Sequence, residues 1–127
     1  MNSIIFRANQ RIEALSPRDR GLAYGDGLFE TMLAVNGEIP WWTAHWQRLA
    51  DGARQLAITL PEQHVIRQAA EQLAENQRCV LKIILTRGES GRGYLPGDGP
   101  ATCIVCSYPA PTELPHPLSL FWCKTGI

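Results

Sequence analysis

The chain has 127 residues, 45% of them hydrophobic, and its twelve basic side chains balance twelve acidic ones. This length suits one domain that buries roughly two-thirds of its unfolded surface. The balanced charge argues against nucleic acid or an anionic membrane as a partner, and no apolar run is long enough to span a bilayer. Because Arg7 precedes any possible signal-peptide core, we expect a cytoplasmic protein whose four cysteines are thiols.

The first third of the chain has the pattern of short strands and turns. Residues 3–6 predict a strand, and a polar, glycine-containing stretch follows. Residues 28–35 are apolar and rich in strand-forming side chains. Asn36-Gly37 is a strong hairpin signal, so we expect residues 38–42 to return as a second strand.

Two consecutive helices are expected next. Thr43 is a candidate cap for the first, and Pro61 suits the first turn of the second. Each helix has one apolar stripe at helical spacing. The stripes are Trp46, Leu49, Ala53 and Leu56 in the first helix, and Ile66, Ala69, Ala70 and Leu73 in the second.

The last third predicts an antiparallel strand pair and a linker. Residues 79–86 form a mostly apolar run, typical of a strand covered on both faces, and residues 101–108 are its expected partner across a glycine-rich loop. Four prolines within residues 109–117 indicate a stiff linker. We therefore expect an α+β domain with a mainly antiparallel sheet over residues 1–108. Residues 109–127 would be an interdomain linker and the start of a truncated C-terminal domain.

Three segments could carry chemistry. In the first, Asp19 to Thr31, glycines flank Tyr24 and allow a sharp turn with the phenol projecting. In the second, Arg48 lies off the apolar stripe of the first helix and can face a cleft. In the third, Arg87 to Tyr94, the residues Arg92 and Tyr94 could bind a carboxylate at a loop rim. Each segment also suits an ordinary structural role.

Other site types are disfavoured. The Arg87–Tyr94 loop lacks the Gly-Lys-Ser/Thr ending of a nucleotide-binding P-loop. Cys103 and Cys106 lie three residues apart in a strand, which places them on opposite faces, and no second ligand pair has metal spacing. No G-x-S-x-G elbow is present, so a serine hydrolase is not indicated either.

Taken together, the three segments resemble the class IV aminotransferase family, the fold-type IV enzymes that use pyridoxal 5'-phosphate (PLP). The matching residues are Asp19-Arg20-Gly21…Tyr24-Gly25-Asp26-Gly27-Leu28-Phe29-Glu30-Thr31, His45-x-x-Arg48-Leu49 and Arg87-Gly88…Gly91-Arg92-Gly93-Tyr94. The third segment is most similar to that of the aminodeoxychorismate lyase branch, whose members release pyruvate and 4-aminobenzoate in folate biosynthesis.

The resemblance implies a small N-terminal domain, a larger second domain, PLP between them and a homodimer. It implies that Arg48 contacts the PLP phosphate, that Tyr24 and Phe29 shape the pocket for a small-molecule substrate, and that Arg92 and Tyr94 recognise a substrate carboxylate. We also expect Arg48 and Tyr24 to face one shared concavity. The lysine that anchors PLP lies in the family's second domain, and neither Lys82 nor Lys124 matches its position.

This departure leaves alternatives open. We expect residues 1–127 alone to be inactive and to supply pocket walls but no catalytic base. A transaminase of the same family, acting on D-amino or branched-chain amino acids, shares the Tyr24 segment. A non-catalytic binding module would also account for the missing lysine.

Overall fold

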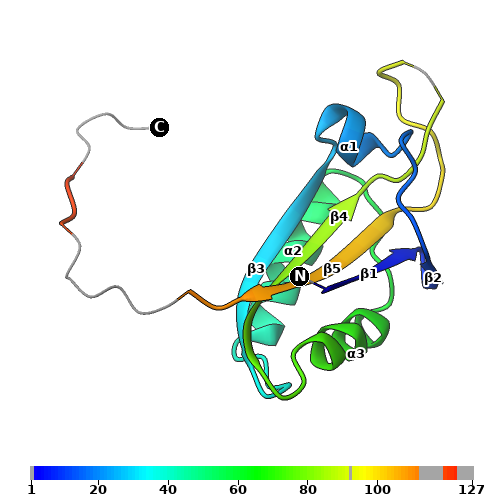
Figure 1. The fold of residues 1–127 in the computed structure, drawn as a ribbon. Coiled ribbons are helices and arrows are strands. Elements are labelled where there is room, and N and C mark those ends of the chain that lie inside the picture. Colours follow the sequence, from blue (N-terminus) through cyan, green and yellow to red (C-terminus); the bar gives the residue numbers. More distant parts are fainter. Residues whose placement is uncertain (1, 92, 112–118, 123–127) are drawn as a thin grey trace.

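The computed structural model describes residues 2–91, 93–111 and 119–122, and it has an α+β fold built on a five-stranded antiparallel sheet (Figure 1). The strand order is β2-β1-β5-β4-β3, and every pair of neighbours is antiparallel. The strands are β1 (Asn2–Arg7), β2 (Gln10–Ile12), β3 (Gly27–Val35), β4 (Arg78–Thr86) and β5 (Thr102–Pro109). The predicted fold class is confirmed, as are the predicted strands at 3–6, 28–35, 79–86 and 101–108.

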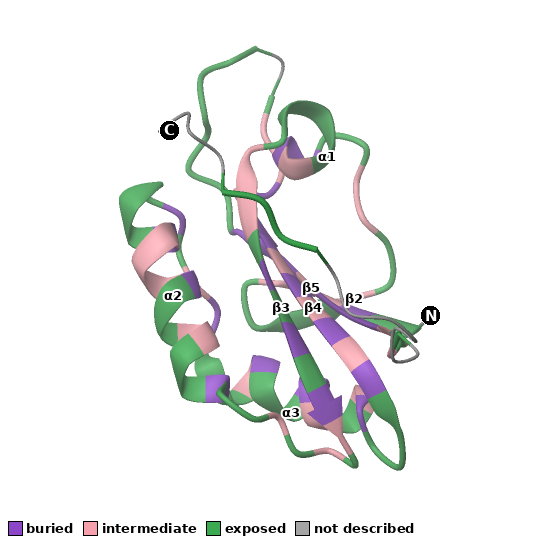
Figure 2. Cartoon of the chain, turned by 90° about the vertical axis from the view of Figure 1, so that its left-hand side faces the viewer, coloured by how far each residue is buried: buried purple, intermediate pink, exposed green. Residues whose placement is uncertain are grey.

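Two consecutive helices cover one face of the sheet, as expected from the apolar stripes. They are α2 (Trp42–Gln55) and α3 (Gln63–Leu73), and a view along the sheet places both on the same side of the strands (Figure 2). A third, short helix, α1 (Arg20–Tyr24), lies at the end of the sheet where β4 finishes (Figure 1). No helix among the described residues is long and apolar enough to cross a membrane.

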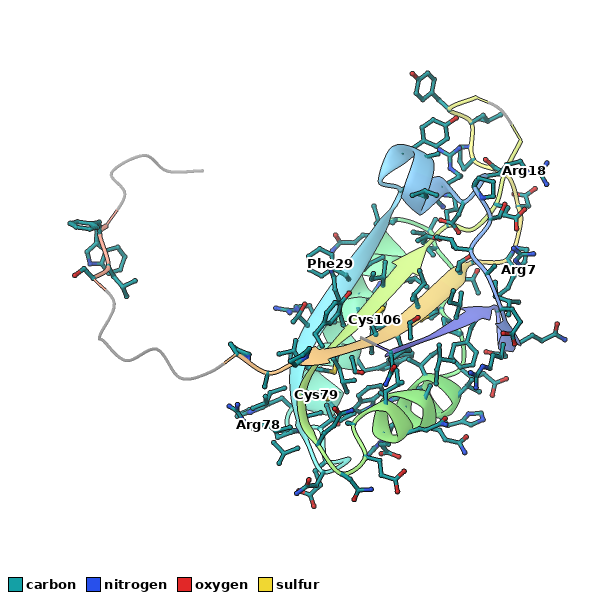
Figure 3. All side chains as sticks on the ribbon, viewed as in Figure 1. Arg7, Arg18, Phe29, Arg78, Cys79 and Cys106 are labelled. Carbon is teal, nitrogen blue, oxygen red and sulfur yellow. The ribbon has the colours of Figure 1, made fainter. Side chains whose placement is uncertain are left out.

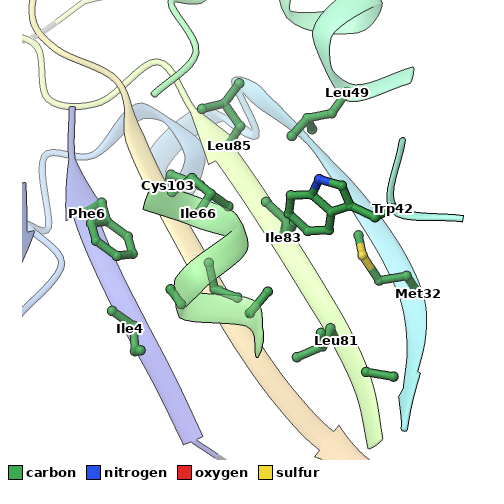
Figure 4. Packing of buried hydrophobic residues seen from close by; sticks show 14 of the residues in the cluster. Ile4, Phe6, Met32, Trp42, Leu49, Ile66, Leu81, Ile83, Leu85 and Cys103 are labelled. Carbon is green, nitrogen blue, oxygen red and sulfur yellow. The ribbon is translucent and has the colours of Figure 1, made fainter. Parts of the chain in front are cut away.

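The core lies between the sheet and these helices (Figure 4). In β4 every second side chain from Cys79 to Leu85 points toward the helices and is buried, which is the period-two pattern of a strand. From the helices, Leu49 and Ile66 pack onto this layer and are almost fully buried. The apolar side chains that the helices and the strands place on their facing sides therefore form one core layer.

The opposite face of the sheet, which we call the open face, has no helix over it in the described part of the chain. Its side chains on the three strands β3, β4 and β5 include Phe29, Leu33, Val80, Lys82, Ile84, Ile104 and Cys106. Phe29 is 59% exposed, and Figure 3 shows it on the side of the sheet that carries no helix. The expectation that residues 79–86 are covered on both faces is therefore wrong for the described residues.

The predicted hairpin forms its turn but not its returning strand. Asn36 and Gly37 both have positive φ, and Val35 and Glu38 exchange two backbone hydrogen bonds of 2.9 and 3.0 Å. The ladder stops there because Pro40 has no N–H to donate and α2 begins at Trp42. β3 consequently remains the edge strand of the sheet.

Both helices begin differently from the prediction. Thr43 is not the cap of α2: Trp41 occupies that position with φ of 66° and makes no capping hydrogen bond from its side chain. The start of α2 is instead fixed by packing, because Trp42 is 4% exposed and stacks on Trp46 with 5.8 Å between ring centroids. Pro61 lies before α3 rather than in its first turn, since Glu62 is the cap.

The sequence patterns did not predict β2 or α1. Both are too short to display a period, with three and five residues. The predicted division at residue 108 stays a prediction, because residues 112–118 and 123–127 of the proposed linker and second domain lie outside the described residues.

Candidate functional site

A buried carboxylate on β3 organises the first cluster of polar side chains. Glu30 points toward the helices and is 4% exposed. Arg48 of α2 binds both of its oxygens, through Nε to Oε1 and Nη2 to Oε2, at 2.6 Å each. His45 Nδ1 lies 2.8 Å from Oε2. Because His45 and Arg48 are three residues apart on one helix face, a single carboxylate can contact both.

The balance of charge at Glu30 favours its ionised form. Burial by itself would raise the pKa of the Glu30 carboxyl, but the hydrogen bonds from Arg48 and His45 outweigh burial and hold that pKa below its usual value. In turn, the hydrogen bonds to Glu30 and its negative charge raise the pKa of Arg48. A paired and hydrogen-bonded charge is the form in which a carboxylate is tolerated in a core.

The pairing leaves one edge of the Arg48 guanidinium available. A guanidinium has five N–H donors, and Glu30 accepts from two of them. The Arg48 side chain is 71% exposed, and no acceptor for Nη1 is found among the described residues. Glu30 therefore fixes the orientation of Arg48 while its other edge can bind an external anion in a bidentate manner.

The second cluster surrounds α1 and Tyr24. Asp19 caps this helix by accepting a 2.8 Å hydrogen bond from the Gly21 amide, and Gly25 ends it with φ of 67°. The Arg20 guanidinium lies over the Tyr24 ring, 4.8 Å from its centroid. Tyr94 approaches the same ring from the β4–β5 loop, with 5.7 Å between centroids. Gly25, which follows Tyr24, thus has a structural use in terminating the helix.

Arg20 anchors the β4–β5 loop. Although charged, it is 5% exposed. Its Nε donates to Asp26 at 2.7 Å, and its Nη atoms donate to the Ser90 hydroxyl, the Gly93 carbonyl and the Tyr94 carbonyl at 3.0–3.3 Å. One side chain therefore connects α1 to the loop that carries two of the predicted substrate contacts.

Asp26 joins this anchor to the end of α2. Its Oδ2 also accepts from Arg87 Nε at 2.9 Å, and the hydrogen bonds from Arg87 and Arg20 outweigh partial burial and lower the pKa of Asp26. Arg87 further donates to the Leu56 and Ala57 carbonyls, which follow α2. This use of a cation matches the partial negative charge at a helix C-terminus.

A cavity of about 370 Å³ lies where α1 meets the open face. Its walls are mainly apolar and come from α1, β3, β4 and β5. The lining residues include Leu22, Leu28, Phe29, Ile84 and Ile104, with Asp19 and Thr86 as polar members. Beside it, Lys82 Nζ lies 4.3 Å from the centroid of the Phe29 ring.

The predicted site residues fall into three groups in the structure. Tyr24 and Tyr94 are brought together, whereas Phe29 lies with Lys82 on the open face and Arg48 lies with Glu30. Tyr24 lines a small cavity together with Arg18 and Ser90, and Arg48 is not among the residues that line it, so the two side chains do not share that concavity. Arg92 lies outside the described residues, and its role stays a prediction.

The buried Cys103 thiol is not activated as a nucleophile. Burial, together with the nearby Cys106, raises the pKa of Cys103 to about 12, so this thiol stays protonated at neutral pH. No cluster of three or more His, Cys, Asp or Glu side chains suited to a metal ion is found in residues 2–91, 93–111 and 119–122.

Sequence reasoning assigned no role to Glu30, Arg20 or Lys82. A signal for Glu30 is present: Leu28, Met32 and Ala34 mark the core-facing positions of β3, and Glu30 falls among them. A charge at a core-facing position requires a buried partner. For Arg20 no local signal exists, because its loop acceptors lie about 70 residues further along the chain.

The Glu30 cluster predicts a specific dependence of stability on pH. Because the pKa of Glu30 is lower in the folded chain than its unfolded value of about 4.3, the stabilisation is present above that value and is lost as pH falls through the folded pKa. Glu30→Gln should lower the free energy of unfolding by about 1–3 kcal/mol at pH 7 and by less at pH 3. Urea unfolding at both pH values measures this. Exposed Glu75→Gln is the control, and equal losses at both pH values would contradict the assignment.

The Arg20 anchor predicts a change in loop accessibility. Arg20→Lys keeps the charge but loses the planar fork, so at least two hydrogen bonds to the loop should be lost. Since each bond to a charged group contributes about 1.5–3 kcal/mol, chymotrypsin should cleave after Tyr94 at least about tenfold faster under native conditions. Arg11→Lys, on exposed β2, is the control. Equal cleavage rates in the two variants would show that Arg20 does not hold the loop.

Comparison with known proteins identifies a family that this chain resembles. Residues 27–124 match the family described as amino-transferase class IV. The chain is 34% identical to the aminodeoxychorismate lyase of Vibrio harveyi, over 72% of this chain and 35% of that protein. It is 33% identical to a putative branched-chain-amino-acid aminotransferase of Methanocaldococcus jannaschii, over 76% of this chain and 35% of that protein.

The fold of the chain is also similar to that of proteins from this family. The crystal structure of 4-amino-4-deoxychorismate lyase from Pseudomonas aeruginosa superposes with a TM-score of 0.74 at 36% identity, covering 89% of this chain and 42% of that one. The chain thus spans only 35–42% of the length of these three proteins. Their family is one of PLP-dependent enzymes. Because the family match extends over more than half of its residues, the chain belongs to the class IV aminotransferases.

Proposed function

We propose that this chain is part of a 4-amino-4-deoxychorismate lyase, a PLP-dependent carbon-carbon lyase that releases pyruvate and forms 4-aminobenzoate in folate biosynthesis. The observation that carries the proposal is the 36% identity to the Pseudomonas aeruginosa lyase over 89% of this chain. The second lyase, at 34% identity, supports it. We include a homodimer and a small-molecule substrate in the proposal because the family resemblance implies both.

The residues around Arg48 fit the PLP phosphate. Glu30 occupies one edge of the Arg48 guanidinium and leaves the other edge exposed, as a bidentate phosphate contact requires. β3 is the edge strand of the sheet, and Phe29 points to its open face while the adjacent Glu30 points to the helices. In the proposed enzyme Arg48 would therefore hold the cofactor phosphate, and Phe29 would supply an apolar contact from the open face of the same edge strand.

In this proposal the chain binds and orients, and PLP supplies an electron sink for the reacting carbon. Arg48 binds the phosphate, and Glu30 and His45 hold Arg48 in position. Phe29 forms an apolar wall that excludes water. Arg20 fixes the β4–β5 loop, so that Tyr94 stays against Tyr24 at the rim. The anchoring lysine is assigned, by resemblance, to the part of the enzyme outside residues 1–127.

The proposed role of Arg48 predicts a loss of PLP affinity. In the complete product of the gene that encodes this chain, Arg48→Lys should weaken PLP binding about tenfold or more. The reason is that a lysine ammonium lacks the two edges with which a guanidinium can bind Glu30 and a phosphate at the same time. Arg54→Lys, on the same helix and 74% exposed, is the matched control. Titration followed by PLP absorbance measures both. An unchanged affinity for Arg48→Lys would remove the phosphate assignment.

The lyase activity has a direct test. The complete gene product, supplied with PLP and aminodeoxychorismate, should release 4-aminobenzoate and pyruvate, which chromatography separates. A transaminase is the second candidate, favoured by the 33% identity to the Methanocaldococcus jannaschii protein. Rapid amine exchange between branched-chain or D-amino acids and keto acids, without 4-aminobenzoate release, would establish that candidate instead.

A further inference from the structure

Four positions in the chain place an aspartate or an asparagine directly before a glycine. They are Asp26-Gly27, Asn36-Gly37, Asp51-Gly52 and Asp98-Gly99. In such a pair the glycine amide nitrogen can attack the side-chain carbonyl carbon of the residue before it, because a glycine has no Cβ to obstruct the approach. The attack also requires that the two reacting atoms come close together in the correct orientation. The surrounding fold therefore determines which of the four pairs can react.

Two of the pairs are restrained by backbone hydrogen bonds. The Gly37 amide donates to the Ala74 carbonyl at 3.0 Å, so this bond must break before its nitrogen can attack the Asn36 side chain. Asp51 and Gly52 lie inside α2, where each amide donates to a carbonyl one turn earlier. Attack in either pair therefore requires local unfolding, whose free-energy cost lowers the rate.

Asp26-Gly27 is restrained by its side chain as well as by its backbone. The hydrogen bonds from Arg87 and Arg20 lower the pKa of the Asp26 carboxyl and keep it ionised. An ionised carboxylate repels an incoming nucleophile and has no hydroxyl group to lose as water. Gly27 is also the first residue of β3 and pairs with Thr86. This pair is consequently a poor candidate for the reaction.

Asp98-Gly99 has none of these restraints in the described part of the chain. Both residues are exposed in the β4–β5 loop. Asp98 forms no ion pair with any described residue, and the Gly99 amide donates no backbone hydrogen bond to one. Gly97 precedes Asp98, so glycines on both sides leave the main chain around Asp98 with few steric restrictions. Exposed loop tips of this kind are among the least stable parts of a fold.

We propose that Asp98 isomerises spontaneously to isoaspartate in the folded protein, through a cyclic imide formed with the Gly99 nitrogen. This nitrogen forms a bond to Cγ of the protonated Asp98 carboxyl, and the carboxyl hydroxyl leaves as water with the amide proton. One water then adds back and breaks either of the two C–N bonds of the imide. Cleavage at Cγ restores aspartate, whereas cleavage at the main-chain carbonyl leaves the chain running through the side-chain carbonyl, which is isoaspartate. Nothing is oxidised or reduced, and water is the only other reactant.

Conversion of Asp98 would change the β4–β5 loop, because isoaspartate adds one carbon atom to the main chain. The two ends of this loop are tightly packed, since the Pro100 carbonyl oxygen occupies the space that a Cβ at Gly88 would need. The base of the loop therefore has no room for the extra atom. We expect the extra atom to displace the tip instead, which Arg20 holds through the Tyr94 carbonyl.

The test measures oxygen exchange in the complete gene product, kept folded at pH 6 in water enriched in heavy oxygen. Each passage through the imide places one heavy oxygen in the peptide, and fragmentation in the mass spectrometer distinguishes isoaspartate from aspartate. Trypsin separates Asp98 from Asp51, since it cleaves after Arg48 and after Arg92. The Asp98 peptide should gain heavy oxygen at least about tenfold faster than the Asp51 peptide, because reaction in α2 requires opening of the helix. In urea the two rates should become similar.

Asp98→Glu should lose the exchange, because closure of the larger six-membered ring is much slower. Asp51→Glu is the matched control and should leave exchange in the Asp98 peptide unchanged. The inference is wrong if the folded protein exchanges at Asp98 no faster than at Asp51, or if the exchanged peptide contains no isoaspartate. The readout needs neither PLP nor substrate, so its outcome is independent of the proposed lyase function.

The effect on the loop has its own readout. Aged protein enriched in isoaspartate should be cleaved by chymotrypsin after Tyr94 about tenfold faster than fresh protein, as expected if one hydrogen bond from Arg20 is lost. Equal cleavage rates would show that the modification does not displace the tip of the loop.

Discussion

The geometry of the candidate site depends on the pairing of a buried carboxylate with an arginine across the edge of the sheet. Glu30 is in a core-facing position, where an unpaired charge would be strongly destabilising. The bidentate contact with Arg48 and the contact with His45 neutralise it, and they also fix where α2 lies relative to β3. The same contacts orient the guanidinium edge that we assign to phosphate. One interaction thus serves both the packing of α2 and the placement of an anion-binding group.

The Arg20 cluster applies the same physical solution with the charges reversed. Here a buried cation is surrounded by Asp26, a hydroxyl and two loop carbonyls. The exposed β4–β5 loop lies against Tyr24 because its acceptors are needed to satisfy the guanidinium. Asp26 also accepts a hydrogen bond from Arg87, and the other donors of Arg87 bind the carbonyls that follow α2. One polar network therefore holds both the β4–β5 loop and the helix that carries Arg48. The two recognition elements of the proposed enzyme are in this way positioned by Arg20, Asp26 and Arg87, to which the proposal assigns no substrate contact.

The sequence predicted those parts of the fold that follow from periodicity, and missed those that follow from packing or from distant partners. Four of the expected strands and the apolar stripes of both helices, except Leu56 just beyond the end of α2, appear where they were expected, because each has a regular spacing of apolar residues along the sequence. Thr43 was a reasonable cap by residue type, but burial of the Trp42 indole starts the helix earlier. The turn at Asn36-Gly37 was predictable because Asn and Gly readily adopt the positive φ values that both residues have in the structure, whereas Pro40 prevents the strand that such turns usually introduce. For the site, the motifs indicated the segments that carry the polar clusters but not the pairing between them, since the contact of Glu30 with Arg48 depends on how β3 and α2 pack.

The apolar residues on the open face of β4 are not explained by the packing seen in the structure, because no helix covers that face in the described residues. An antiparallel sheet with one solvated face normally alternates apolar and polar side chains. In β4 the outward positions are Val80, Lys82 and Ile84, and the neighbouring outward position on β5 is Ile104. Two of the three outward positions on β4 are therefore apolar, as in a strand that contacts something on both faces. A lysine within such a face is costly to cover unless its cover brings a negative charge. The apolar run that led the sequence to predict a doubly covered strand is thus present on both faces of β4, although the described residues cover only the face that packs on the helices.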